Sequence, residues 1–423
     1  MKKFLSAILS VSILSMGILS GCMEQFIIKE SSSDAEASQT LQTVDSQDEL
    51  EEGEVEFYYE ENPKIDTADD NVTSTCNLSQ SEIDAIVKNT DNVLAQYPDF
   101  SGTVLLSAGD RIIYEKSYGR TGKGTDKNEN DTYYQIGSVT KQFTGTAIYL
   151  LEREGKINTS DTIDKYFPEY AEYDWVKTVT IEHLLQMSEG MTDYMELIEG
   201  EQELLDGYLK AAKKTDKEAQ KFIVKTIFDE GISTTPGIVY RYSNSAYYLL
   251  GVIIEQVSGM SYRDYLQKNF FDMAGMKDTY FVGDGKDCQI GYSYTEEKFI
   301  CEKTDKYLAA EGDYPYLFSA GSVVSTVEDV NKWLDVVVSD KLFSDADRKK
   351  IEKSLLLYNY GWNTSDNLWH HSGRTYLYSS QVFADYHTDT KMVILTNIAF
   401  YDTLNQISLE VYMPLVSAAK SKK

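Results

Sequence analysis

Residues 136–141 read IGSVTK, and apolar residues at helical spacing continue from this motif to Glu154. The pattern predicts a helix that begins near Ser138. Positions three apart lie on one helix face, so Ser138 and Lys141 are expected to point into one pocket. A serine hydroxyl becomes a nucleophile when a neighbouring base takes its proton, and a neutral lysine amine can be that base. Ser138 is therefore a candidate nucleophile with Lys141 as its base; the alternative is a serine that only caps the helix.

A second motif, YSN at residues 242–244, leads into an apolar helix predicted over residues 247–257. An extended or tightly turned segment would present Tyr242 and Asn244 together. A phenol can relay a proton, and an amide can hydrogen-bond both a substrate carbonyl and a lysine. The alternative is a turn whose polar residues cap the following helix.

A third motif, HSG at residues 371–373, precedes two β-like runs at residues 379–385 and 391–397. Gly373 would allow a substrate backbone to come close. A strand edge at this point also offers a backbone N–H for an oxyanion hole. The alternative is a loop histidine, His371, beside a turn glycine.

These three motifs, in this order and far apart in the chain, resemble those of the serine β-lactamase and penicillin-binding-protein-like family. The closest likeness is to its branch of class C β-lactamases, DD-peptidases and esterases. The resemblance covers about residues 80–418 and includes connecting sequence such as FSGTVLLSAGDRIIYEKSYG at 100–119 and SAGSVVSTVEDVNKWL at 319–334. It implies an enzyme that forms an acyl intermediate on serine and needs no cofactor.

The resemblance implies a role for each matching residue. Ser138 would be the acylated nucleophile and Lys141 its base, while Tyr242 would assist proton transfer. The other implied roles are substrate orientation and oxyanion stabilisation, assigned to Asn244, His371, Gly373 and the backbone N–H groups of Ser138 and Arg374.

The third motif departs from the family pattern, because its first position is usually lysine and is His371 here. The change removes a fixed cation that would hold a substrate carboxylate and favour the phenolate of Tyr242. It favours a peptidase or esterase over an efficient β-lactamase. Arg374 is a candidate to replace the lost charge.

The predicted fold class is α+β and β-lactamase/transpeptidase-like. An antiparallel sheet would be built from an N-terminal hairpin at residues 100–119 and the C-terminal strands, and flanked by helices predicted at 81–97 and 403–417. A mainly helical lobe at about residues 145–260 would be inserted in this domain, which we place at residues 79–420.

The N-terminus predicts export. Lys2 and Lys3 precede an apolar run that ends in LSGC at residues 19–22, which resembles the lipobox of bacterial lipoproteins. Residues 1–21 would be the signal peptide and Cys22 the acylated first residue of the mature protein; the alternative is an ordinary secretory signal. Residues 22–78 would form a disordered tether, since residues 30–70 hold fifteen acidic residues and one basic residue.

The composition limits which partners and ligands the protein is expected to bind. The net charge is −28 with no basic stripe, which argues against nucleic acid. Four histidines and no Cys-x-x-Cys pair give no credible metal site, while Cys288 and Cys301 could form a disulfide in an exported protein. We expect a monomer, lipid-anchored on the extracytoplasmic face of the cell membrane, with a small peptide, ester or β-lactam substrate. The alternatives are a β-lactamase, a lipase-like esterase, and a non-catalytic lipoprotein that binds cell-wall peptides.

Overall fold

The computed structural model describes residues 75–121, 127–284, 293–295, 298–300, 314–354, 358–365, 367–375, 377–398 and 401–422. Cys22, the acidic residues up to position 74, and the pair Cys288 and Cys301 lie outside these ranges, so the predictions made for them are not examined by the structure. Among the described helices, none combines the length and the apolar composition that crossing a membrane requires.

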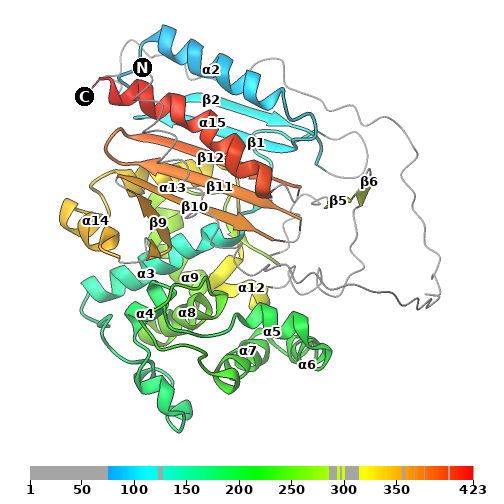
Figure 1. Ribbon diagram of the computed structural model, residues 1–423, viewed down its shortest axis with the longest axis vertical. Coiled ribbons are helices and arrows are strands. Elements are labelled where there is room, and N and C mark those ends of the chain that lie inside the picture. The colour runs from blue at the N-terminus through cyan, green and yellow to red at the C-terminus, as the bar shows by residue number, and fades with distance from the viewer. Residues whose placement is uncertain are drawn as a thin grey trace, which may run out of the picture. The chain divides into compact units, whose positions relative to one another are not determined.

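Seven strands form one antiparallel sheet in the order β2-β1-β12-β11-β10-β9-β8 (Figure 1). The strands are β1 (Gly102–Ala108), β2 (Arg111–Tyr118), β8 (Tyr358–Asn359), β9 (Trp362–Ser365), β10 (Leu368–Arg374), β11 (Ser379–Asp385) and β12 (Thr390–Thr396). Gly102 at the start of β1 lies opposite Thr396 at the end of β12. The N-terminal hairpin and the C-terminal strands therefore share one sheet, which confirms the predicted α+β class.

One face of this sheet is covered by α2 (Gln80–Leu94) and α15 (Tyr401–Lys420), the first and last described helices (Figure 1). They pack on each other and on the sheet. Alternate residues of a strand face opposite sides, so Val104 and Leu106 of β1 meet these helices while Leu105 faces the other way.

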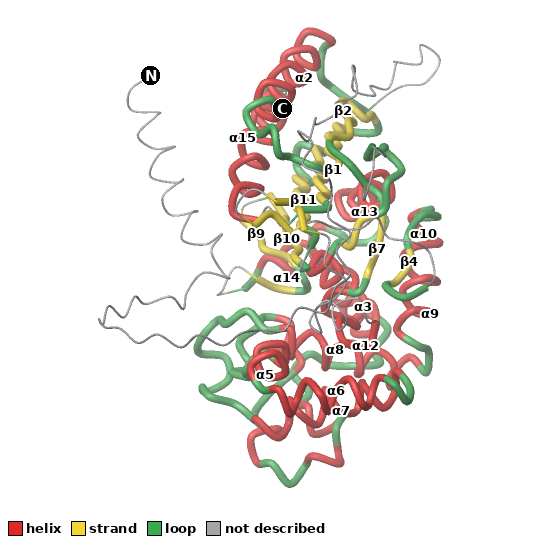
Figure 2. Tube along the Cα trace, turned by 90° about the vertical axis from the view of Figure 1, so that its right-hand side faces the viewer, coloured by secondary structure: helices red, strands yellow, loops and turns green. Residues whose placement is uncertain are grey.

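The other face packs against α3 (Thr140–Arg153) and α13 (Val327–Val338), as Figure 2 shows. Phe143 of α3 lies 4.6 Å from Trp333 of α13, ring centroid to ring centroid. The Trp333 indole N–H also donates to the side chain of Gln142 across 3.1 Å. Packing in the core between these helices and the sheet fixes the position of α3, and with it the position of the residues beside Ser138.

The segment between α3 and β7 is mainly helical. It contains α4 (Ile181–Leu185), α5 (Tyr194–Gly200), α6 (Gln202–Ala212), α7 (Asp216–Glu230), α8 (Asn244–Ser258), α9 (Tyr262–Leu266), α10 (Asp272–Ala274) and α12 (Tyr314–Gly321), with α14 (Asp345–Glu352) following α13. A small antiparallel sheet combines β3 (Tyr134–Gln135), β7 (Val323–Ser325) and β4 (Tyr280–Phe281), and β5 (Ser293–Thr295) pairs with β6 (Lys298–Ile300). Short turns are η1 (Gly137–Val139), η2 (Ile163–Lys165), η3 (Pro168–Tyr170), η4 (Asp174–Lys177) and the π-helical η5 (Gln267–Phe271).

Candidate active site

Ser138 lies in the 3₁₀ turn η1, and not in the helix that follows it. The helix was predicted to begin near Ser138, and α3 begins two residues later, at Thr140. Gly137 has φ +51°, a left-handed conformation that glycine adopts without strain and that turns the chain sharply before the serine. The serine side chain is left partly exposed at the end of a buried helix.

Lys141 is fully buried and holds the centre of the predicted site. Its Nζ lies 2.9 Å from the Ser138 Oγ, 2.7 Å from the Asn244 Oδ1 and 2.7 Å from the Ala320 carbonyl oxygen. A neutral amine has two N–H groups and one lone pair. If the amide and carbonyl oxygens take the two N–H groups, the lone pair faces the Ser138 hydroxyl, which is the arrangement of a general base.

The contact with Ala320 was not predicted from the sequence. Ala320 lies in α12, where Phe318 interrupts the helical backbone with φ +36° and ψ −129°. A positive φ is unusual for a residue with a side chain, and such conformations are found where the surrounding structure enforces them. The kink lies two residues before the carbonyl that accepts from Lys141.

Asn244 is the first residue of α8, whose start is capped by Ser243. Its side chain links Lys141 to Asp193: Oδ1 accepts from Lys141, and Nδ2 donates to Asp193 Oδ2 across 2.8 Å. Asp193 is a residue that sequence reasoning missed. Its own role as the cap of α5, where it accepts from the Met195 N–H across 2.9 Å, was the one available signal.

Tyr242 also lies beside Lys141, as its motif predicted. The Lys141 Nζ lies 5.0 Å from the centroid of the Tyr242 ring. The same ring lies 6.3 Å from the His371 ring and 6.3 Å from the Tyr358 ring. The structure therefore brings residues of all three motifs together around one amine.

His371 belongs to strand β10 and is 2% exposed. Its Nδ1 lies 2.5 Å from the Ser372 carbonyl oxygen and its Nε2 lies 3.0 Å from the Tyr358 hydroxyl. Since a carbonyl oxygen only accepts, we assign the ring proton to Nδ1, so that Nε2 accepts from Tyr358. Burial, together with the nearby Lys141 charge, lowers the pKa of His371 to about 3. The third motif therefore holds a neutral ring at neutral pH.

Gly373 and Arg374 lie against the turn that carries Ser138. A β-carbon on Gly373 would lie 2.0 Å from the Ile136 carbonyl oxygen, and one on Gly137 would lie 2.8 Å from the Arg374 backbone nitrogen. Gly373 thus lets the backbone at Ile136 come close. The sequence predicted the approach of a substrate backbone there, and not that of the protein's own chain. The Arg374 side chain is exposed at the end of β10.

Strand β9 pairs with β10 only at residues 368–370. Beyond this ladder, residues 371–374 lie beside the η1 turn that carries Ser138. The role of this strand edge as an oxyanion donor stays a prediction. The backbone nitrogen of Arg374 lies on this edge and next to the η1 turn.

A second buried carboxyl group, that of Glu189, lies beneath the Tyr242 segment. Helix α4 ends at Leu185, and the loop that follows bonds the chain before Tyr242: the Met187 carbonyl accepts from the Arg241 N–H across 2.9 Å. Burial raises the pKa of Glu189, which is 1% exposed, to about 8. Neither the sequence nor the family resemblance indicated this residue.

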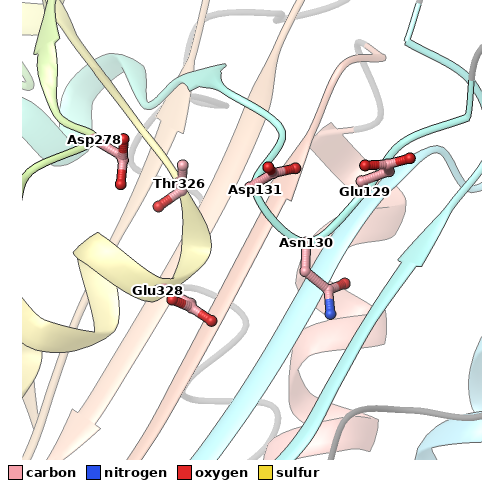
Figure 3. Close-up of a pocket in the computed structure, with 6 residues that line it drawn as sticks. All are labelled: Glu129, Asn130, Asp131, Asp278, Thr326 and Glu328. Atoms are coloured by element: carbon pink, nitrogen blue, oxygen red, sulfur yellow. The ribbon is translucent and has the colours of Figure 1, made fainter.

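A polar cavity of about 300 Å³ lies elsewhere (Figure 3), lined by Glu129, Asn130, Asp131, Asp278, Thr326 and Glu328. None of the predicted site residues lines it. Over the ranges that the structure describes, no group of three or more His, Cys, Asp or Glu side chains is arranged to hold a metal ion.

Comparisons with known proteins identify the family and the fold of this chain. The family described as Beta-lactamase matches residues 90–407. Penicillin-binding protein 4* of Bacillus subtilis (strain 168) is 29% identical over 64% of this chain and 60% of its own length, so the chain spans less than two thirds of that relative. The PbpX protein of the same strain is 26% identical over 81% of this chain and 82% of its own length.

Among solved structures, FmtA from Staphylococcus aureus has the same fold. The TM-score is 0.64, at 22% identity, and the likeness covers 81% of this chain and 93% of that chain. The family match extends over most of the chain and includes all three motifs. The protein is therefore a member of the beta-lactamase family, whose members are serine hydrolases.

Proposed function

We propose that this protein is a membrane-tethered serine acyl hydrolase that forms an acyl-enzyme on Ser138. The observation that carries the proposal is the contact of Lys141 Nζ with Ser138 Oγ at 2.9 Å, inside a set of acceptors that leaves the amine lone pair for the serine proton. Tyr242 beside the same amine supplies a second group for proton transfer.

The reaction proceeds in two acyl transfers. The Ser138 oxygen attacks the carbonyl carbon of an amide or ester as its proton passes to Lys141, and the backbone N–H groups of Ser138 and Arg374 bind the oxyanion. The leaving amine or alcohol takes the proton as its bond to the carbonyl carbon breaks. Water then attacks the acyl-enzyme, the acid is released, and Ser138 regains its proton.

The substrate class follows from the third motif. A neutral, buried His371 cannot supply the cation that lysine provides at that position, so a substrate carboxylate is not held there. We therefore place neutral esters ahead of β-lactams. Peptides of the DD-peptidase type also end in a carboxylate, so they need another cation, for which Arg374 is the candidate.

The cellular location is part of the proposal. The lipobox-like LSGC at residues 19–22 would attach the protein to the outer face of the membrane through Cys22, and the acidic residues 30–70 would act as a spacer. Peptidoglycan stem peptides are within reach of an enzyme held there. Replacing Cys22 with alanine should move the protein from the membrane fraction to the medium.

Intact-protein mass spectrometry after incubation with a fluorophosphonate and with a fluorescent penicillin tests the activity. We expect both to label the wild type at Ser138 and neither to label Ser138→Ala. A folded wild type that neither reagent labels would overturn the proposal in favour of a non-catalytic binder of cell-wall fragments. D-Ala-D-Ala peptides, nitrophenyl esters and a chromogenic cephalosporin then separate peptidase, esterase and β-lactamase activity.

A further inference from the structure

The orientation of the Asn244 side-chain amide decides what Lys141 can do. The oxygen and the NH₂ group of an amide are interchangeable in shape, so their partners determine which one faces which neighbour. On one side, the Asp193 carboxylate accepts from both the backbone N–H and the Nδ2 of Asn244, each across 2.8 Å. Backbone N–H groups only donate, and one bonds each Asp193 oxygen: the Met195 N–H bonds Oδ1 and the Asn244 N–H bonds Oδ2. Both oxygens therefore act as acceptors, so the NH₂ group of Asn244 faces Asp193 and its oxygen faces Lys141.

The opposite orientation would change the serine–lysine hydrogen bond. If Nδ2 of Asn244 faced Lys141, the lone pair of a neutral amine would accept from that NH₂ group. The amine would then donate one N–H to Ala320 and the other to the Ser138 oxygen. In that arrangement Ser138 could not pass its proton to the lysine.

We infer that Asp193 is a positioning residue, which fixes the Asn244 amide so that the lone pair of Lys141 faces the Ser138 hydroxyl. The inference rests on the proposed function, since it assigns Lys141 as the base. The hydrogen bonds of Asp193 described above go to Met195 and Asn244, and its charge also interacts with that of Lys141. The positioning effect is the one that runs through Asn244.

The way in which Asp193 caps α5 supports a positioning role for this residue. Asp193 is 6% exposed, and burying a carboxylate is costly unless it is well bonded. Capping α5 needs one acceptor only, and other described helices use a hydroxyl for it, as Thr215 does for α7. The second oxygen of Asp193 is the one that bonds Asn244. A carboxylate is needed here for the contact with Asn244, and not for the cap.

Asp193→Ser tests the inference, because serine keeps a good cap but is too short to reach the amide of Asn244. We expect the rate of fluorophosphonate acylation to fall about 30- to 100-fold, within the usual range for disabling a general base, with KM for a nitrophenyl ester changed by no more than about twofold. Asp193→Asn, which retains one acceptor, should keep more of the acylation rate than Asp193→Ser does. Thr215→Ala removes a distant cap and should leave the rate unchanged.

A double-mutant cycle separates positioning from a structural effect. In an Asn244→Ala background, Asp193→Ser should lower the acylation rate by less than about threefold, since the group it acts through is gone. An equal loss in both backgrounds, or wild-type acylation by Asp193→Ser, would overturn the inference while the proposed function stands. Failure of the wild type itself to be acylated at Ser138 would overturn the proposed function, and this inference with it.

Discussion

The Tyr358 hydroxyl lies 3.0 Å from His371 Nε2, while the Ser372 carbonyl oxygen accepts from Nδ1 and so sets the tautomer of the third-motif ring. Tyr358 also lies within 6.3 Å of the Tyr242 ring, centroid to centroid, so it joins the second and third motifs. A lysine at position 371 would have placed a cation here. In this protein the position is occupied by a neutral histidine that accepts a hydrogen bond from a buried tyrosine.

Replacing Tyr358 with phenylalanine should leave His371 Nε2 without this donor. A buried polar group that loses its partner costs about 1–3 kcal/mol, so we expect the free energy of unfolding to fall by that amount. Denaturant unfolding measures the loss, and nitrogen NMR of His371 reports its tautomer. Wild-type spectra with the proton on Nε2 would contradict the assignment made here.

Replacing Lys141 with methionine removes the proposed base while keeping an unbranched side chain of similar length in a buried site. We expect the acylation rate to fall by about 10²- to 10⁴-fold, the usual contribution of a general base. Labelling by a fluorophosphonate over time measures it, and circular dichroism checks the fold. Acylation of the variant at the wild-type rate would show that another group takes the serine proton.

Replacing Arg374 with alanine tests whether its exposed side chain takes over the task of the missing lysine. If it does, kcat/KM should fall about tenfold or more for substrates with a free carboxylate and change little for neutral nitrophenyl esters, because one charge pair is lost. Arg111→Ala, on the distant strand β2, is the matched control. Equal losses on both substrate types would rule out a charge-specific role.

Replacing Glu189 with glutamine should alter how stability depends on pH. The pKa of this carboxyl is about 8 in the folded protein and near 4.5 in an unfolded chain. Between these values the unfolded state loses the proton and the folded state keeps it, so the free energy of unfolding falls as pH rises. This one group lowers the free energy of unfolding by on the order of 4 kcal/mol across that pH range. The Glu189→Gln variant should not show this decrease.

Denaturant unfolding at pH 5 and pH 8 measures that difference for wild type and variant. The two proteins should differ in the slope of stability against pH, with the variant the less affected by raising the pH. Parallel slopes would show that Glu189 is ionised in the folded protein at neutral pH.

The parts of this molecule with a regular pattern could be predicted from the sequence. The two β-like runs predicted at 379–385 and 391–397 are the strands β11 and β12, almost to the residue. Three-residue spacing placed Ser138 and Lys141 together, even though Ser138 lies in a 3₁₀ turn. The structure also brings Tyr242, Asn244 and His371 to Lys141, while their catalytic roles stay predictions.

The supporting residues could not be predicted, for physical reasons. Ala320 acts through a backbone carbonyl, which every residue has. Glu189 and Asp193 lie between α4, which ends at Leu185, and α5, which begins at Tyr194, where no regular spacing of apolar residues indicates which side chains are buried. Tyr358 is one tyrosine among 32 and belongs to a strand of two residues, too short for any periodicity to show.

The pairing of β1 with β12 has a consequence for how the chain reaches its native state. Gly102 meets Thr396, nearly three hundred positions later, so the central pairing of the sheet has a very high contact order. While the chain is being synthesised, the N-terminal hairpin has to wait with an unpaired edge until the last strand arrives. Folding is therefore completed only after the whole chain has emerged, and this hairpin is the segment most in need of protection from aggregation until then.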